Sequence, residues 1–244
     1  MAEKTVLITG GARGIGRALA LCLAQRKWNI ALCYRKSEAD AESARAAISA
    51  LGAEALTIKC DVSDADAAEQ MVTTVEQRFG GVDILINAAG PYHRVPLLDE
   101  TLEGWHEMFD NNLHPIFYLA RRIAPTMKRA GWGRIINFSM ANADQMIGQT
   151  HVTAHYIAKV AVLVLTRSLA KTLAADGITV NAVSPGFIDS GSAPEAELKK
   201  MQKKIPAKAI GELKDAVSAV EYLLSDEASY VNGANIHLSG AWGI

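Results

Sequence analysis

The sequence has few cysteines, no excess of either charge and no long apolar run. Its 244 residues include 25 Lys+Arg and 26 Asp+Glu, for a net charge of -1. This balance excludes a basic nucleic-acid-binding surface as the main function, and it excludes an acidic tail. No apolar run approaches the roughly 18 residues that a membrane span requires. The first residues, Met1–Lys4, lead directly into an apolar run, so no signal peptide is expected.

The 3 cysteines, Cys22, Cys33 and Cys60, are too few and too irregularly spaced for a disulfide framework. We expect reduced thiols that pack as small apolar groups in a cytoplasmic protein. Apolar residues make up 50% and charged residues 21% of the chain, which is typical of a globular protein of enzyme size. His151 and His155 have the spacing of a helical zinc site, but no third ligand is evident, so no metal is predicted.

Short apolar runs alternate with longer helical segments along the whole chain. Strands are predicted at Thr5–Thr9, Asn29–Cys33, Ala55–Lys59, Ile84–Asn87, Arg134–Phe138, Thr179–Val183 and Asn235–Leu238. Helices are predicted at Gly14–Gln25, Glu38–Leu51, Asp64–Phe79, Leu102–Lys128 and His155–Ala175. This order predicts an α/β fold, a Rossmann-type, doubly wound, mostly parallel sheet of seven strands with helices on both faces. We expect one domain over 1–244, with the lysine-rich segment 189–208 as a flap.

A glycine-rich segment, Thr9–Gly16, follows the first strand and opens the first helix. Glycines there permit a tight turn and a close approach of the backbone to phosphate, and the helix N-terminus offers free N–H groups to a pyrophosphate. The segment predicts a dinucleotide site that includes Gly10, Gly14, Ile15 and Gly16; a purely structural glycine turn is the alternative.

The end of the second strand bears on the choice of cofactor. A carboxylate near this point would bind the ribose hydroxyls of NAD. The sequence instead has Cys33-Tyr34-Arg35-Lys36. The Arg35 guanidinium suits a 2′-phosphate, and Arg13 in the glycine segment can approach the same group. We therefore predict NADP(H), with Tyr34 beside it; two solvated surface cations are the alternative.

Further motifs along the chain make the sequence similar to the short-chain dehydrogenase/reductase family. They are the glycine segment together with Asp61-Val62, Asn87-Ala88-Ala89-Gly90, Asn112-Leu113, Gly133–Asn137, Val180–Gly186 and Ser225–Gly233. Their order and spacing extend the resemblance over essentially the whole chain. Within the family, the pattern is most similar to bacterial beta-ketoacyl carrier-protein reductases and their relatives.

The resemblance implies roles for the matching positions. Asp61 and Val62 would hold the adenine, and Asn112 would belong to a proton relay. The cofactor cleft would be lined by Asn87, Ala88 and Gly90, and the nicotinamide by Pro185, Gly186, Ile188 and Ser190. The resemblance also implies a homotetramer or homodimer, built partly on the helix that contains the apolar run Val160–Leu165. A helix fully buried within one subunit is the alternative.

The family's catalytic residues are a Tyr four residues before a Lys, and a Ser after the fifth strand. Lys159 matches the lysine, which would hold the nicotinamide ribose and tune the acid. The position four residues earlier is His155, and Tyr156 is only three residues away. The serine position is occupied by Met140, whose thioether offers no hydrogen-bond donor. The segment between this position and the helix is about two residues longer than usual.

Three hypotheses follow from this atypical motif. In the first, the loop and the start of the helix are remodelled so that Ser139, Tyr156 and Lys159 converge. In the second, His155 replaces the tyrosine as general acid near neutral pH. In the third, the protein binds NADP(H) with little or no catalysis and has a regulatory or binding role. The leading function is NADPH-dependent reduction of a carbonyl, a beta-ketoacyl thioester or a small ketone. Reduction of a pteridine or imine is a minor alternative.

Overall fold

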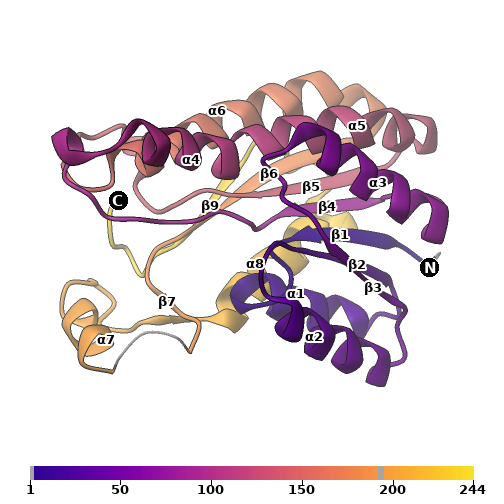
Figure 1. The fold of residues 1–244 in the computed structure, drawn as a ribbon, viewed down its shortest axis with the longest axis horizontal. Helices are drawn as coiled ribbons and strands as arrows, with labels where there is room; N and C mark the ends of the chain where they lie inside the picture. The colour runs from indigo at the N-terminus through magenta and orange to yellow at the C-terminus, as the bar shows by residue number, and fades with distance from the viewer. Residues whose placement is uncertain (1–2, 192–194) are drawn as a thin grey trace.

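The computed structural model describes residues 3–191 and 195–244, and its centre is a seven-stranded parallel sheet (Figure 1). The strand order is β3-β2-β1-β4-β5-β6-β9. The strands are β1 (Thr5–Thr9), β2 (Asn29–Tyr34), β3 (Ala55–Lys59), β4 (Ile84–Asn87), β5 (Gly133–Phe138), β6 (Ile178–Pro185) and β9 (Asn235–Leu238). The predicted fold class and all seven predicted strands are confirmed, within two residues at each end.

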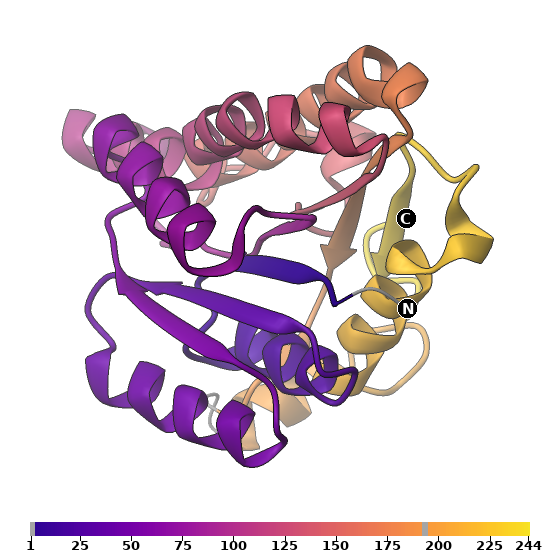
Figure 2. The same ribbon diagram turned by 90° about the vertical axis from the view of Figure 1, so that its right-hand side faces the viewer.

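Helices cover both faces of the sheet, as Figures 1 and 2 show. One face carries α3 (Ala65–Phe79), α5 (His114–Ala130) and α6 (Thr153–Leu173), and the other carries α1 (Gly14–Ala24), α2 (Glu38–Ala50) and α8 (Leu213–Leu224). Successive residues of β1 point to opposite cores: Leu7 packs in the first, whereas Val6 and Ile8 pack in the second. No helix among residues 3–191 and 195–244 is long and apolar enough to span a membrane.

The prediction of one continuous helix over Leu102–Lys128 is wrong. The structure has two helices there, α4 (Leu102–Asn112) and α5, with Leu113 between them. Pro115 has no N–H to donate to a preceding turn, and it disfavours helical geometry at the residue before it. The side-chain amide of Asn112 also donates to the Met108 carbonyl, at 2.9 Å. The break places Asn112 at the end of α4, facing the sheet edge.

The segment predicted as a flap begins in a small two-stranded parallel sheet. This sheet pairs β7 (Ile188–Asp189) with β8 (Gly211–Glu212), and α7 (Glu195–Gln202) lies between them in the chain. Figure 1 shows α7 projecting beyond the main sheet on the side of β7. Positions 192–194 of the predicted flap lie outside the described residues. Whether the segment moves stays a prediction.

A buried chain of side-chain hydrogen bonds joins the sheet to α6. The Asn87 amide donates to the Asn137 side-chain oxygen at 2.8 Å, and the Asn137 amide donates to the Thr166 hydroxyl at 2.9 Å. The Thr166 hydroxyl donates to the Val162 carbonyl at 2.8 Å. These residues are almost inaccessible to solvent, so each bond fixes the position of α6 against β4 and β5.

We expect Thr166→Val to lower the free energy of unfolding by about 1–3 kcal/mol, because it leaves the buried Asn137 amide without an acceptor. Thr172→Val is the matched control: its hydroxyl makes the same type of bond to a helix carbonyl, but at an exposed position of the same helix. Urea denaturation measures both. Equal effects of the two substitutions would contradict the role given to the buried chain.

Candidate active site

The loops that follow the parallel strands meet at the edge formed by the strands' carboxyl ends. In a doubly wound sheet this edge is where ligands bind, beside the point where the strand order reverses. Here the order reverses between β1 and β4, which are hydrogen-bonded neighbours. Two cavities open at this edge, one beside the loops after β1, β2 and β3, and the other beside the loops after β4, β5 and β6.

The glycine segment has the shape that a pyrophosphate requires. Gly10 has a positive φ of 67°, and a Cβ there would lie 2.9 Å from the Ala89 Cα. A Cβ on Gly16 would overlap the carbonyl oxygen of Gly10. No side chain caps the N-terminus of α1 and no acidic residue lies in its first turn, so its N–H groups and partial positive charge are available to an anion. These residues fit a dinucleotide.

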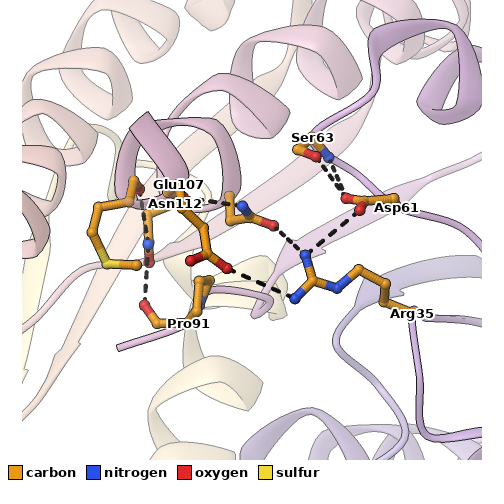
Figure 3. A network of polar contacts seen from close by, with 8 residues as sticks. Arg35, Asp61, Ser63, Pro91, Glu107 and Asn112 are labelled. Carbon is orange, nitrogen blue, oxygen red and sulfur yellow. Dashed lines mark hydrogen bonds and ion pairs between the residues drawn. The ribbon is translucent and has the colours of Figure 1, made fainter. Parts of the chain in front are cut away.

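The first cavity has a volume of about 350 Å³ and suits the adenosine end of the cofactor. Its lining includes the predicted residues Gly10, Arg13, Tyr34, Arg35, Asp61, Val62, Ala88 and Gly90. Figure 3 shows Arg35 in contact with residues of α4 and of the loop after β3. The guanidinium lies 3.5 Å from the Asp61 carboxylate and 4.0 Å from the Glu107 carboxylate, and it donates to the Asn111 side-chain oxygen at 3.3 Å.

Asp61 is held in place from its other side by Ser63, whose hydroxyl and backbone N–H both donate to the carboxylate. Partial burial raises the pKa of Asp61, but these hydrogen bonds and the Arg35 guanidinium outweigh it, so the pKa is lowered below its ordinary value. The side chain is therefore an ionised acceptor. Arg13, at the other side of the cavity, lies 3.6 Å from the Asp40 carboxylate. Sequence reasoning missed Asn111 and Glu107, which belong to no glycine or strand-end motif.

The second cavity has a volume of about 790 Å³. It combines residues predicted for the nicotinamide with residues predicted for catalysis: Ile15, Ala88, Gly90, Ser139, His155, Lys159, Pro185 and Gly186. Asn87, from the end of β4, is buried behind this lining, and its side-chain oxygen has no partner. Ser190 lies beside Gly14, where a Cβ on the glycine would be 3.9 Å from the serine Cβ. Ile188 instead packs against Gly211 and lines a separate cavity beside β9.

Lys159 is the buried cation of the second cavity. Its ammonium donates to the Phe138 carbonyl at the end of β5, at 2.8 Å. Burial lowers the pKa of Lys159 to about 8, so the amine is still mostly protonated at neutral pH. Gly90 lies directly beside it, since a Cβ there would be 3.4 Å from the lysine Nζ and would overlap the Asn112 side-chain oxygen. That oxygen is buried without a hydrogen-bond partner, and the Asn112 amide donates to the Pro91 carbonyl (Figure 3).

His155 lies one helical turn before Lys159 and packs edge-to-face against Tyr92, with ring centroids 5.2 Å apart. Burial and the neighbouring Lys159 charge lower the pKa of His155 to about 3, against a weaker opposing effect of the Pro91 carbonyl. The imidazole is therefore neutral at physiological pH. The hypothesis that His155 is the general acid stays a prediction, and burial beside a cation disfavours the imidazolium that it requires. A neutral imidazole still donates a hydrogen bond.

Ser139 lines the cavity together with Lys159, whereas Tyr156 does not. The Ser139 hydroxyl donates to the Lys159 carbonyl at 2.8 Å. The Tyr156 hydroxyl donates to the Asn142 carbonyl at 2.8 Å and accepts from the Ile147 N–H at 3.0 Å. Tyr156 is 4% exposed and is absent from the cavity lining, because its side chain leaves the helix on a different side from that of His155. Both hydroxyls hold backbone in place.

Comparisons with known proteins agree with this geometry. A family model described as enoyl-(acyl carrier protein) reductase matches residues 10–241. The chain is 39% identical over 243 residues to 3-oxoacyl-[acyl-carrier-protein] reductase FabG of Staphylococcus epidermidis, with 98% of each chain covered. The corresponding reductase of Synechocystis is 32% identical over 241 residues, covering 98% of this chain and 97% of the relative. The chain belongs to the short-chain dehydrogenase/reductase family.

Solved structures give the same result. Levodione reductase superposes with a TM-score of 0.89 at 30% identity, covering 97% of this chain and 96% of that one. Acetoin dehydrogenase YohF of Salmonella typhimurium has a TM-score of 0.90 at 30% identity, with 98% and 96% covered. This family member is a nicotinamide-dependent oxidoreductase. The comparisons favour neither the non-catalytic alternative nor a pteridine or imine reductase.

We expect Gly16→Ala to weaken binding of a nicotinamide dinucleotide at least about tenfold, equivalent to about 1.4 kcal/mol, because the new Cβ displaces the Gly10 carbonyl. In the control Gly81→Ala, the Cβ would lie 3.5 Å from a Thr126 methyl group, an ordinary contact far from the site. Fluorescence titration with the reduced cofactor measures both. Unchanged affinity in Gly16→Ala would contradict the assignment of the glycine segment.

Proposed function

We propose that the protein reduces a carbonyl compound, a 3-oxoacyl thioester or a small ketone, with NADPH. The observation that carries this function is the second cavity, where a buried ammonium and a neutral imidazole lie beside residues suited to a nicotinamide. The names of the relatives support a carbonyl as the group reduced, because they include 3-oxoacyl reductases and an acetoin dehydrogenase. When bound, the reduced nicotinamide supplies the hydride to the carbonyl carbon.

The preference for NADPH rests on the two arginines of the first cavity. Arg35 and Arg13 both line it, and neither Tyr34 nor Lys36 supplies a carboxylate for the ribose hydroxyls. The Arg35 guanidinium can bind a 2′-phosphate, while Asp61 holds it from one side. Asp61 and Val62 then face the adenine, and the N-terminus of α1 binds the pyrophosphate.

His155 and Lys159 have different roles at the carbonyl oxygen of the substrate. The neutral imidazole of His155 donates a hydrogen bond to that oxygen and stabilises the negative charge that develops there. The Lys159 ammonium is the proton source for the resulting alkoxide, and Asn112 lies beside it to pass protons in from solvent. Ser139 and Tyr156 are positioning residues: the first holds the backbone of Lys159, and the second holds the loop 142–147.

The protein forms a homotetramer or homodimer in this proposal, and it works in the cytoplasm, where thiols stay reduced and NADPH is available. Large apolar side chains lie exposed on the outer surfaces of α5 and α6, namely Phe117, Ile157 and Val164, which are 40–58% exposed. Burial of such a surface against a second copy removes this apolar area from water.

We expect sedimentation to give the mass of a dimer or a tetramer of the 26.1 kDa chain. Val164→Glu, at an exposed apolar residue of α6, is expected to dissociate this oligomer. Thr172→Glu, also exposed on α6 and near its end, is the control for an added charge. A monomeric wild-type protein at micromolar concentration would contradict the oligomer.

We expect Arg35→Gln to raise the Kd for NADPH about 10–100-fold and to leave the Kd for NADH within about twofold, because only NADPH carries the phosphate that the guanidinium binds. Arg17→Gln is the control, because Arg17 is a half-buried arginine on α1 that does not line the cavity. Equilibrium titration of each protein with NADPH and with NADH measures these Kd values. Equal affinity of the wild-type protein for NADH and NADPH would contradict the role of Arg35.

We expect the kcat for reduction of a 3-oxobutanoyl thioester to be constant between about pH 6 and 7 and to fall above about pH 8. The sign follows from Lys159: its protonated form is the active one, it is present below the pKa, and it is lost as the pH rises through that value. Burial has lowered the pKa, so this loss comes at lower pH than for an exposed lysine. A kcat that instead rises tenfold for each unit of falling pH would contradict the role of Lys159 and would make the His155 imidazolium the proton donor.

Substitution of His155 tests its hydrogen bond. His155→Phe is expected to lower kcat about 10²–10³-fold with little change in the Kd for NADPH, and His155→Gln, which keeps an N–H donor, is expected to recover part of the loss. NADPH oxidation over thioesters and small ketones provides the assay. Turnover that survives in His155→Phe but is lost in Tyr156→Phe would transfer the role to Tyr156.

A further inference from the structure

The charged residues that line the second cavity are all cations. Among the described residues of the lining, these are Arg94, Lys159 and Lys204, and none is a carboxylate. Lys159 is engaged with the Phe138 carbonyl at the inner end of the cavity. Arg94 and Lys204 are exposed side chains that reach the lining from outside, so they lie where the cavity opens to solvent. The cavity therefore carries excess positive charge that the proposed reduction does not use.

The charged groups of Arg94 and Lys204 do not stabilise the fold through a described polar contact. Neither forms an ion pair or a side-chain hydrogen bond with any side chain that the structure describes. Other arginines of the chain are paired in several ways; Arg122, for example, binds the Glu76 carboxylate with two nitrogens. An arginine and a lysine that both line one cavity without a protein partner are suited to an anionic ligand.

The backbone that carries each cation is fixed, although the two come from distant segments. The loop containing Arg94 is bonded to the segment before α6, by Val95 N–H to the His151 carbonyl at 2.8 Å and by Leu97 N–H to the Thr150 carbonyl at 2.9 Å. Lys204 precedes Ile205, which is only 1% exposed. These anchors bring the loop after β4 and the end of the α7 segment to the same cavity.

The remaining lining is largely apolar. It includes Tyr92, Met140, Val152, Phe187, Met201 and Trp242, and the rings of Phe187 and Trp242 pack edge-to-face with centroids 4.7 Å apart. Apolar walls lower the local dielectric and strengthen the attraction between a cation and a bound anion. They also leave a short carbon chain as the suitable link between an anionic group at the opening and a carbonyl at the inner end.

We propose that the substrate is an oxo acid, whose carbonyl oxygen meets His155 and Lys159 and whose carboxylate lies between Arg94 and Lys204. This inference rests on the proposed function and narrows its substrate class. A cavity of about 790 Å³ is on the order of 10 Å wide, so the anion must lie close to the carbonyl. A carboxylate on a short chain satisfies this condition. The phosphate of a 4′-phosphopantetheine thioester does not, because it sits at the far end of a long flexible arm.

Matched pairs of substrates isolate the carboxylate. The probes are 3-oxobutanoate, 4-oxopentanoate and 5-oxohexanoate, each with its methyl ester, which keeps the carbonyl and removes the charge. We expect at least one acid to have a kcat/KM at least about tenfold above that of its ester. We expect Arg94→Gln and Lys204→Gln each to raise KM for that acid about tenfold, with kcat within about twofold and KM for the ester unchanged.

Lys203→Gln is the matched control, because Lys203 is an exposed neighbour of Lys204 that does not line the cavity. It is expected to leave KM for the acid unchanged. Esters reduced as well as acids, or an equal effect of Lys203→Gln and Lys204→Gln, would overturn the proposal. A preference for an acetoacetyl thioester of 4′-phosphopantetheine over that of pantetheine, with no preference among the acid and ester pairs, would overturn it in favour of a distant phosphate.

A binding measurement separates this inference from the proposed function. Calorimetric titration of the protein saturated with NADP⁺ uses the matching hydroxy acids and their methyl esters, and it needs no turnover. Tighter binding of the acid than of the ester, lost in Arg94→Gln, supports the anion site even if no carbonyl is reduced. Equal binding of acid and ester overturns the inference while leaving carbonyl reduction intact.

Discussion

The hydrogen bond from the Lys159 ammonium to the Phe138 carbonyl is the contact on which the site depends. It joins α6 to the end of β5, and two further bonds act between the same elements: Ser139 to the Lys159 carbonyl, and Asn137 to Thr166. A buried cation with a single carbonyl partner is costly unless its surroundings hold it in place. Here the surroundings are the end of β5 in the parallel sheet and the helix packed on it, so the charge remains at the cavity.

The chemistry of the neighbouring residues follows from that charge. His155 lies one turn away and is held neutral by burial and by the lysine, so we propose that it serves as a hydrogen-bond donor. Met140, at the position predicted to match the family's serine, packs with Val160 against a small apolar cluster. Because Tyr156 does not line the cavity and the Ser139 hydroxyl donates to the Lys159 carbonyl, we propose Lys159 as the group that supplies the proton. In the proposed mechanism, His155 thus takes over the hydrogen bond to the carbonyl oxygen, and Lys159 takes over the donation of the proton.

Much of the fold was predictable because local and long-range signals agree. The seven strands are apolar runs bounded by turns, and the glycine segment stands between a strand and a helix, so both were predicted from the sequence. The break at Leu113 was missed because the apolar pattern continues across it. Pro115 was the signal that could have located it.

The site itself was predictable only in part. Motif positions placed Lys159, His155 and Asn112 at one edge of the sheet, and the structure brings them together. Periodicity showed that Tyr156 and His155 leave the helix in different directions, but only the loop geometry determines which of them faces the cavity. The ionisation of His155 depends on burial, which no spacing reveals. Arg94 and Lys204 belong to no motif, and their meeting at one cavity depends on how distant loops pack.

The central proposal is that this cavity transfers a hydride to a carbonyl without Tyr156 as the proton donor. The most direct test is incubation with NADPH deuterated at the transferred position of the nicotinamide ring and a carbonyl substrate, followed by mass spectrometry of the product. The account predicts an alcohol that carries one deuterium on the former carbonyl carbon, formed by the wild-type protein and by Tyr156→Phe. Bound but unconsumed NADPH, or label transfer abolished in Tyr156→Phe alone, would contradict it.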